Sequence, residues 1–217
     1  MSRFEKWPMM LRLLLFCTLG VGLYLSVTSG YLIAKAELAQ FLLGRSWAIA
    51  QQDQQRQAIK PWPWADMYPI AKISIPELDW SAIILEGTSG EALAFGPGHW
   101  RESVRPGTHG NSVVAGHRES HFNILKLLHV GDVLHVERRD GRVVSYAVNS
   151  VNIVHETDLS VLNDSSETKL TLITCYPVDS VTAGGELRLA ITAVAALRGN
   201  TVWSGTGATS NTVVGQI

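Results

Sequence analysis

Cysteine is scarce in this chain of 217 residues, which contains only Cys17 and Cys175. Cys17 lies in a long uncharged stretch near the N-terminus, whereas Cys175 ends an apolar, β-branched run at residues 170–175. A disulfide between the two would have to join a predicted membrane segment to a distant domain. The sequence therefore argues against an intrachain disulfide and predicts that Cys175 is a free thiol.

Charged residues are also few, at 17% of the chain with a formal net charge of −1. The chain has no run of basic residues, which argues against nucleic acid as a partner. Hydrophobic residues make up 46% of the chain, and part of that fraction belongs to the N-terminal stretch. After residue 60, about 140 residues precede a polar tail, which is enough for one domain with its own core but short for two.

The uncharged stretch at residues 13–34 predicts a single membrane-spanning helix. Its 22 residues carry no charge, and at about 1.5 Å per residue they can cross a hydrocarbon core of about 30 Å. Positive charge is more frequent before the stretch, at Arg3, Lys6 and Arg12, than after it, which places the N-terminus in the cytoplasm and the domain outside. A cleaved signal peptide is the alternative, because residues 34–36 resemble a small-x-small cleavage site. The stretch exceeds the apolar core of about 7 to 15 residues in signal peptides, so an anchor is favoured.

The rest of the chain divides by composition into a stalk, a domain and a tail. The composition of the stalk favours helix, and the prolines of residues 61–64 are expected to end that helix. The tail is rich in Gly, Thr, Ser and Asn without a detectable period, which predicts a flexible segment. The predicted order is a cytoplasmic N-terminus at 1–12, the anchor at 13–34, a helical stalk and linker at 35–60, one folded domain at 61–198 and the tail at 199–217.

From residue 69 onward, the pattern is one of short strands separated by turns. Asp140-Gly141 lies between two such runs and predicts a hairpin turn. Short helices are predicted at residues 90–95 and 122–128, and they do not alternate with strands in the βαβ manner. The expected class is therefore mainly β, an antiparallel barrel or sandwich. The strand candidates are residues 70–75, 80–85, 112–115, 132–137, 143–154, 169–174 and 186–194.

Cys175 and Arg188, each near a strand end, suggest a covalent catalyst. A cysteine thiol is mostly protonated at neutral pH, so a catalytic cysteine needs a cation or base nearby. His117 is the strongest of the seven histidines for that role, because it follows an apolar strand and a glycine and can project into a groove. The sequence leaves two plainer readings open. Cys175 could continue a core face with Ile173, and Arg188 could face solvent.

A metal site is the other chemistry that histidines could supply, but the spacing argues against it. His117 and His121 are four residues apart with Glu119 between them. This order differs from the His-Glu-x-x-His and His-x-x-Glu-His motifs of zinc peptidases. The scattered carboxylates of the later loops, such as Glu156 and Asp164, are expected to be solvated. The sequence therefore predicts no metal and no other cofactor.

Taken together, the motifs of this chain resemble the sortase family. Residues 171–175 are similar to the sortase signature around the catalytic cysteine, Gly116-His117 matches the histidine site, and Arg188 lies in the following strand where the sortase arginine lies. The resemblance covers residues 61–196.

Three segments, with the N-terminal anchor, make the chain most similar to sortases of Gram-negative bacteria. These segments are Ala94 to His99, Ala115 to Arg118 and Thr174 to Pro177. The wall-anchoring role of Gram-positive sortases does not transfer to a Gram-negative cell, so the acceptor amine stays open.

The resemblance implies a cysteine transpeptidase on a closed eight-stranded β-barrel. Cys175 would attack a C-terminal sorting motif of the Leu-Pro-x-Thr-Gly type and form a thioester. His117 would move the protons, and Arg188 would hold substrate and stabilise the oxyanion. The neighbours Thr174 and Tyr176 are expected to contact substrate. An amine that resolves the thioester gives ligation, and water gives slow hydrolysis, as in a thiol protease.

The resemblance also implies where the enzyme works and what it meets. It would be a single-pass protein of the inner membrane with its catalytic domain in the periplasm, acting on a dedicated substrate protein and an unknown amine. The rival enzymes are an L,D-transpeptidase and a papain-like peptidase, but the Ser-His-Gly-Cys context of the first and the Cys-x-x-x-Cys-Trp-like context of the second are missing. A non-catalytic, membrane-tethered β-domain with a buried cysteine is the alternative from another class.

Overall fold

The computed structural model describes residues 9–53, 57–180, 182 and 184–196. Residues 1–8 of the predicted cytoplasmic segment and the whole predicted tail at 199–217 lie outside the described residues.

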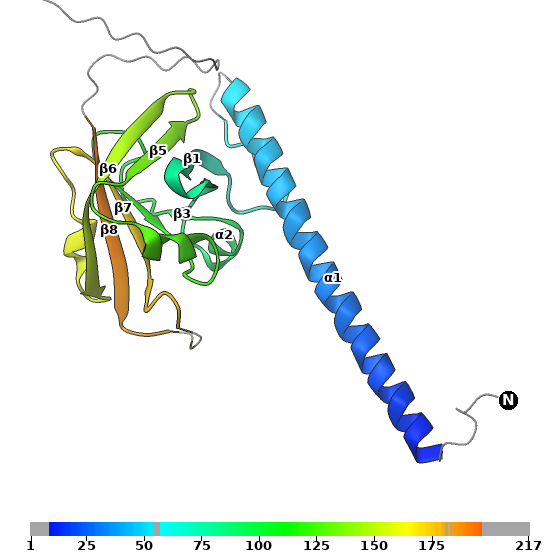
Figure 1. The fold of residues 1–217 in the computed structure, drawn as a ribbon. Coiled ribbons are helices and arrows are strands. Elements are labelled where there is room, and N and C mark those ends of the chain that lie inside the picture. The colour runs from blue at the N-terminus through cyan, green and yellow to red at the C-terminus, as the bar shows by residue number, and fades with distance from the viewer. Residues whose placement is uncertain (1–8, 54–56, 181, 183, 197–217) are drawn as a thin grey trace, which may run out of the picture.

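Eight strands close into one β-barrel in the order β1-β2-β3-β4-β7-β8-β6-β5 (Figure 1). Most neighbours are antiparallel, but β3 runs parallel to β2, and β7 runs parallel to β4. The closed eight-stranded barrel that the resemblance implied is therefore confirmed. The strands are β1 (Pro69–Ile75), β2 (Trp80–Glu86), β3 (Gly98–His99), β4 (Gly110–Ala115), β5 (Val133–Arg138), β6 (Val143–His155), β7 (Thr168–Tyr176) and β8 (Leu187–Ala195). The short helical segments are η2 (Pro76–Leu78), α2 (Gly90–Phe95), η3 (His121–Leu127) and η4 (Leu159–Leu162).

The barrel interior is filled by apolar side chains that alternate along the strands. On β7, Leu170 and Leu172 are fully buried members of the main core, whereas Ile173 is half-buried. Alternate residues of a strand point to opposite faces, so β7 directs its even-numbered side chains inward and its odd-numbered ones outward. Cys175 therefore continues the outer face of β7.

A single helix, α1 (Met9–Gln52), leads into the barrel. Its 44 residues extend for about 66 Å at about 1.5 Å per residue. The helix is long and apolar enough to cross a membrane, and none of its most apolar window is buried. α1 thus runs without a break through the predicted anchor and through residues 35–52 of the predicted stalk, and it ends before the prolines that were expected to stop it.

The second half of α1 packs against the side of the barrel (Figure 1). Ala39, Leu43 and Trp47 are buried at intervals of four residues, which places them on one helix face. Leu43 belongs to a second apolar cluster with Ala65, Met67, Leu85 and Ala92. The sequence predicts a stalk between anchor and domain. The structure instead docks this segment on the barrel, because its apolar face finds a complementary cluster there.

Two glutamine side chains fix the docking of α1 at each end. Gln40 Nε2 donates to the Phe95 carbonyl at 2.8 Å, and Gln51 Nε2 donates to Glu137 Oε1 at 2.6 Å. These bonds tie one end of the docked segment to α2 and the other end to β5.

Candidate active site

Cys175 lies at the end of β7, on the outer face of the barrel. It is a free thiol and is partly exposed. On the antiparallel neighbour β8, its direct cross-strand partner is Arg188. The outward direction and the partial exposure of Cys175 disfavour the reading of this residue as a core cysteine.

His117 reaches the same place from β4. β4 and β7 are parallel, with Ala115 opposite Ile173, and the Gly116 N–H donates to the Ile173 carbonyl at 3.1 Å. Parallel strands end at the same edge of a sheet, so continuing this register by two residues places His117 beside Cys175. His117 is exposed. Cys175 thus lies between His117 on one side and Arg188 on the other.

The backbone around His117 is held by three successive carbonyls. The Gly116 carbonyl accepts the Thr174 hydroxyl at 2.8 Å, and the Arg118 carbonyl accepts Asn123 Nδ2 at 3.1 Å. Between them, the His117 carbonyl accepts the Phe122 N–H at 3.1 Å. The position of the histidine is therefore set by β7 and by the start of η3.

Arg188 is not simply exposed to solvent, because its guanidinium is bonded within the protein. One terminal nitrogen donates to the carbonyls of Gly185 at 2.6 Å and Leu187 at 2.9 Å. The other donates to Glu156 Oε2 at 2.5 Å. Arg188 is 26% exposed and Glu156 is 44% exposed, so the pair lies at the surface of the site. Glu156, which was expected to be a solvated carboxylate, is the ion-pair partner of the candidate catalytic arginine.

The two residues expected to contact substrate differ in their placement. Thr174 is 2% exposed, and its hydroxyl is donated to Gly116. It lies on the inward face of β7, which favours a role in positioning His117 over contact with substrate. Tyr176 is partly buried and packs against the main core, on the inward side of the strand end.

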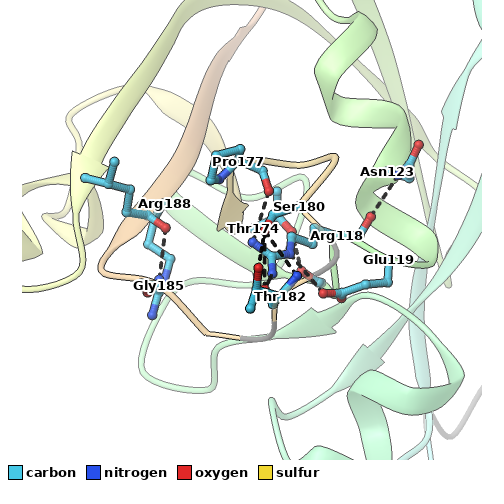
Figure 2. Close-up of polar contacts among 11 residues, drawn as sticks. Arg118, Glu119, Asn123, Thr174, Pro177, Ser180, Thr182, Gly185 and Arg188 are labelled. Atoms are coloured by element: carbon cyan, nitrogen blue, oxygen red, sulfur yellow. Dashed lines mark hydrogen bonds and ion pairs between the residues drawn. The ribbon is translucent and has the colours of Figure 1, made fainter.

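Arg118 is the buried residue of the site that sequence reasoning missed. It is 1% exposed and is the largest of the fully buried side chains in the described residues. Its guanidinium donates to Glu119 and to the carbonyls of Pro177 and Thr182 (Figure 2). No strand pattern in the sequence indicates this burial, because Arg118 lies in the turn that follows β4.

The pKa values of two side chains near His117 are shifted from their ordinary values. Burial lowers the pKa of His121, and the nearby His117 lowers it further. The hydrogen bond from Arg118 lowers the pKa of Glu119, which keeps that carboxylate ionised.

The carboxylates of the β6–β7 loop bind backbone N–H groups of the protein. Asp158 accepts from the Ser160 N–H at 3.0 Å, and Asp164 accepts from Asn111 at 3.2 Å and Ser165 at 2.8 Å. Hydrogen bonds from the side chain and the backbone of Ser160 lower the pKa of Asp158, and those from the backbone of Ser165 and Asn111 lower the pKa of Asp164. Over the described residues, no group of three His, Cys, Asp or Glu side chains is placed to hold a metal ion.

Comparison with known proteins gives one consistent family. The family model for the sortase domain matches residues 73–196. Sortase D of Bacillus subtilis (strain 168) is 33% identical over 110 residues, which are 50% of this chain and 55% of that protein. Sortase A of Listeria monocytogenes is 26% identical over 113 residues, 49% of each chain. The chain spans about half the length of the curated relatives that it matches.

Solved structures of similar proteins have the same barrel. Sortase A from Corynebacterium diphtheriae aligns with a TM-score of 0.55 at 30% identity, covering 64% of this chain and 66% of that one. A Clostridium perfringens sortase D5 transpeptidase aligns with a TM-score of 0.61 over 74% of this chain and 99% of its own. At 22% identity, the second likeness concerns the fold alone.

Proposed function

The chain belongs to the sortase family, and on that premise we propose that it is a membrane-anchored cysteine transpeptidase of the Gram-negative class. It cleaves a C-terminal sorting motif of the Leu-Pro-x-Thr-Gly type and transfers the acyl group to an amine. Family membership leaves no place for the L,D-transpeptidase and papain-like alternatives. The observation that supports the proposal is the strand arrangement: Arg188 is the cross-strand partner of Cys175, and His117 follows β4, which runs parallel to β7.

The first half-reaction makes a thioester. The Cys175 thiolate attacks the carbonyl carbon before the scissile bond, a C–S bond forms, and the C–N bond to the leaving amine breaks. His117 gives its proton to that amine as it leaves. Arg188 stabilises the negative charge that develops on the carbonyl oxygen. Because Glu156 and two backbone carbonyls already orient the guanidinium, little reorganisation is needed.

The second half-reaction resolves the thioester. The acceptor amine attacks the thioester carbonyl and passes a proton to the His117 imidazole, and the C–S bond breaks to release the Cys175 thiolate. Water in place of the amine gives a free carboxylate by slow hydrolysis. His117 thus acts as the acid in the first half-reaction and as the base in the second.

The anchor bears on the location of the enzyme, and the family bears on its partners. α1 spans the inner membrane once through residues 13–34, with the N-terminus in the cytoplasm and the barrel in the periplasm. The partner is a dedicated protein that carries the sorting signal at its C-terminus, and the acceptor is an amine whose identity stays open. The site uses no cofactor and no metal.

Intact mass spectrometry of the full chain in detergent micelles tests the proposal. The chain is incubated with a panel of Leu-Pro-x-Thr-Gly-like peptides, with and without an added amine. We expect an acyl adduct on Cys175 that disappears into amine-ligated product when the amine is present. The matched control is Cys175→Ala, which should fold, because it removes an outward-facing thiol, and should form no adduct.

A thiol-reactive reagent separates the enzyme from a non-catalytic β-domain. A catalytic Cys175 should label in the folded protein and lose reactivity in His117→Ala. Labelling only after unfolding, together with no adduct from any peptide, would refute the transpeptidase and leave a binding module.

A further inference from the structure

We propose that Arg118 is a positioning residue that holds the described part of the loop between β7 and β8, residues 177–180, 182 and 184–186, in the shape that receives substrate. The loop starts two residues after Cys175 and ends two residues before Arg188. Arg118 follows His117 directly in the chain. One side chain therefore connects the strand end that carries the histidine to the loop that joins the cysteine to the catalytic arginine.

The contacts of Arg118 are directed at loop backbone. Nε donates to Glu119 Oε1 at 2.9 Å, one terminal nitrogen donates to the Pro177 carbonyl at 3.0 Å, and the other donates to the Thr182 carbonyl. In Figure 2, Arg118 lies among Pro177, Thr182 and Glu119 with its guanidinium at the centre of these bonds. The planar fork of the guanidinium reaches both carbonyls at once, which a lysine ammonium at the end of a single stem cannot do.

The burial of this charge makes the bonds mutually dependent. A buried guanidinium is costly unless its N–H groups are satisfied, and Arg118 is 1% exposed. Its carboxylate partner Glu119 is 58% exposed, so the loop carbonyls supply the rest of the compensation. The folded shape of the loop satisfies the arginine, and the arginine in turn selects that shape.

Val178 also anchors the loop, because its side chain is buried in the main core, whereas the ion pair that attaches the loop to η3 lies at the surface. Lys126 Nζ contacts Asp179 Oδ1 at 2.5 Å, and these side chains are 36% and 72% exposed. Exposed pairs of this kind contribute little. Within the described part of the loop, the Ser180 N–H donates to the Pro177 carbonyl at 3.2 Å, the same carbonyl that Arg118 holds. Losing the buried guanidinium should therefore loosen the internal turn of the loop as well.

The effect on catalysis rests on the proposed function, whereas the effect on the loop does not. Arg118→Lys keeps the charge but loses the second carbonyl bond. We expect hydrogen exchange of the segment 178–182 to become about tenfold faster or more, with the barrel strands unchanged. With the best peptide, we expect kcat/KM to fall by about tenfold or more, chiefly through a higher KM, because the chemical groups stay in place while the docking surface is loosened.

The experiment uses the full chain in detergent micelles and three further variants. Arg118→Gln keeps one donor nitrogen but has no charge to bury. It replaces the lysine variant in the test if that variant does not fold. Lys126→Met removes the surface attachment, and Arg142→Lys changes an arginine that is 79% exposed in the β5–β6 turn. Both should behave as the unchanged protein.

The outcomes decide separately between the two proposals. Faster loop exchange without any acyl adduct in the unchanged protein would support the role of Arg118 in the loop and reject the transpeptidase. Unchanged loop exchange and an unchanged KM in both Arg118 variants would overturn the inference. So would faster exchange throughout the barrel in both variants, because Arg118 would then be a general stabilising residue.

Discussion

Arg188 has a structural role in the protein beside the catalytic role proposed for it above. Its two terminal nitrogens serve three acceptors on different parts of the chain: two backbone carbonyls next to it and the Glu156 carboxylate. A guanidinium fork fits this arrangement, whereas a lysine ammonium offers one nitrogen on a flexible stem. The geometry at this residue therefore depends on shape as much as on charge.

We predict that Arg188→Lys lowers kcat by about a hundredfold, the size of effect expected when a preorganised donor to a developing oxyanion is lost. Steady-state kinetics with the best peptide measures the effect. Arg101→Lys is the control, because Arg101 is also ion-paired, to Glu86 at 3.7 Å, but lies elsewhere on the barrel. Unchanged kinetics in Arg188→Lys would remove this residue from the mechanism.

His99 gives a pH dependence of stability that is independent of catalysis. It is 2% exposed, and Nε2 lies 3.0 Å from the Val104 carbonyl. Burial lowers the pKa of His99 and outweighs the carboxylate of Glu86 at 3.9 Å from Nδ1. The other charged groups that face it, Arg105 and Glu102, act in opposite directions. The folded state thus favours neutral His99.

We predict that the free energy of unfolding falls as the pH drops below about 6.5, the pKa of an unfolded histidine. In that range the unfolded chain binds a proton that folded His99 does not, so acid favours unfolding. His121, whose pKa is also lowered, acts in the same direction. Thermal unfolding at pH 7.5 and 5.5 measures the change, and His99→Gln should reduce it. His129→Gln, at an exposed histidine, is the control, and an equal pH dependence in all three proteins would contradict the assignment.

At the residue scale, sequence reasoning reaches as far as a strand pattern fixes direction. Alternation puts Cys175 on the same strand face as Ile173, but the sequence left open whether that face was the core, and in the structure both side chains are partly exposed. Arg118 could not be placed this way, because its burial depends on carbonyls 59 and 64 residues further along the chain. Glu156 was missed for the same reason, since its partner Arg188 comes 32 residues later.

At the scale of elements, the junction between β4 and η3 determines where His117 lies. Gly116 occupies this junction, and a Cβ built on it would lie 2.7 Å from the ring of Phe122, which is fully buried. Gly116 is held by its N–H bond to Ile173 and by the Thr174 hydroxyl. The strand end is thus tied to β7 by hydrogen bonds, and the ring is enclosed in the core.

We predict that Gly116→Ala costs about 1–3 kcal/mol in the free energy of unfolding, as overpacking of a filled core does. Because the clash lies one residue from His117, activity should fall as well. Denaturant unfolding and steady-state kinetics measure the two effects. Gly90→Ala is the control, since a Cβ there meets nothing within 4 Å. In the double variant Gly116→Ala/Phe122→Leu, the smaller leucine side chain should relieve the clash and recover part of the lost stability. Equal stability of all variants would show that the junction can relax.

Strands and helices could be predicted from the sequence where they are long enough to show a residue pattern. Seven predicted strands correspond to observed ones, and the helix predicted at residues 90–95 is α2. β3 was missed because its two residues are too few to show alternation. The segment predicted as a helix at 122–128 is instead the 3-10 segment η3, since its length was evident from the sequence but its hydrogen-bonding pattern was not.

At the scale of the whole molecule, the docking of α1 sets how far the barrel lies from the uncharged stretch and which end of the barrel points toward that stretch. The uncharged stretch ends at residue 34 and the first buried residue of the docked face is Ala39, a rise of about 7 Å along the helix. The sequence could not show this docking, because the partners of Leu43 lie in loops and strands from residue 65 onward. The end of the barrel that carries the β7–β8 connection lies toward the N-terminal half of α1, and the β5–β6 turn lies toward its C-terminal end (Figure 1).

If α1 spans the bilayer as proposed, the candidate active site faces the membrane at short range. A substrate held in the same membrane should then be processed best when few residues separate its sorting motif from its own anchor. We predict that inserting seven residues, about two helical turns, between Glu37 and Leu38 raises the barrel by about 10 Å with little rotation. The optimal spacer in the substrate should lengthen by about three residues, since an extended chain spans about 3.3–3.6 Å per residue.

Ligation in proteoliposomes with a series of substrate spacers measures this shift, and a soluble peptide serves as the internal control. Peptide ligation should be equal in both proteins, because the insertion lies outside the docked face that begins at Ala39. The same seven residues added at the C-terminus should leave the optimum unchanged. An optimum that stays the same in the raised enzyme, while peptide ligation is intact, would mean that the helix does not fix the distance between barrel and membrane. If the docked helix is rigid, the optimal spacer should lengthen, because each added turn moves the whole barrel, and Cys175 with it, away from the membrane.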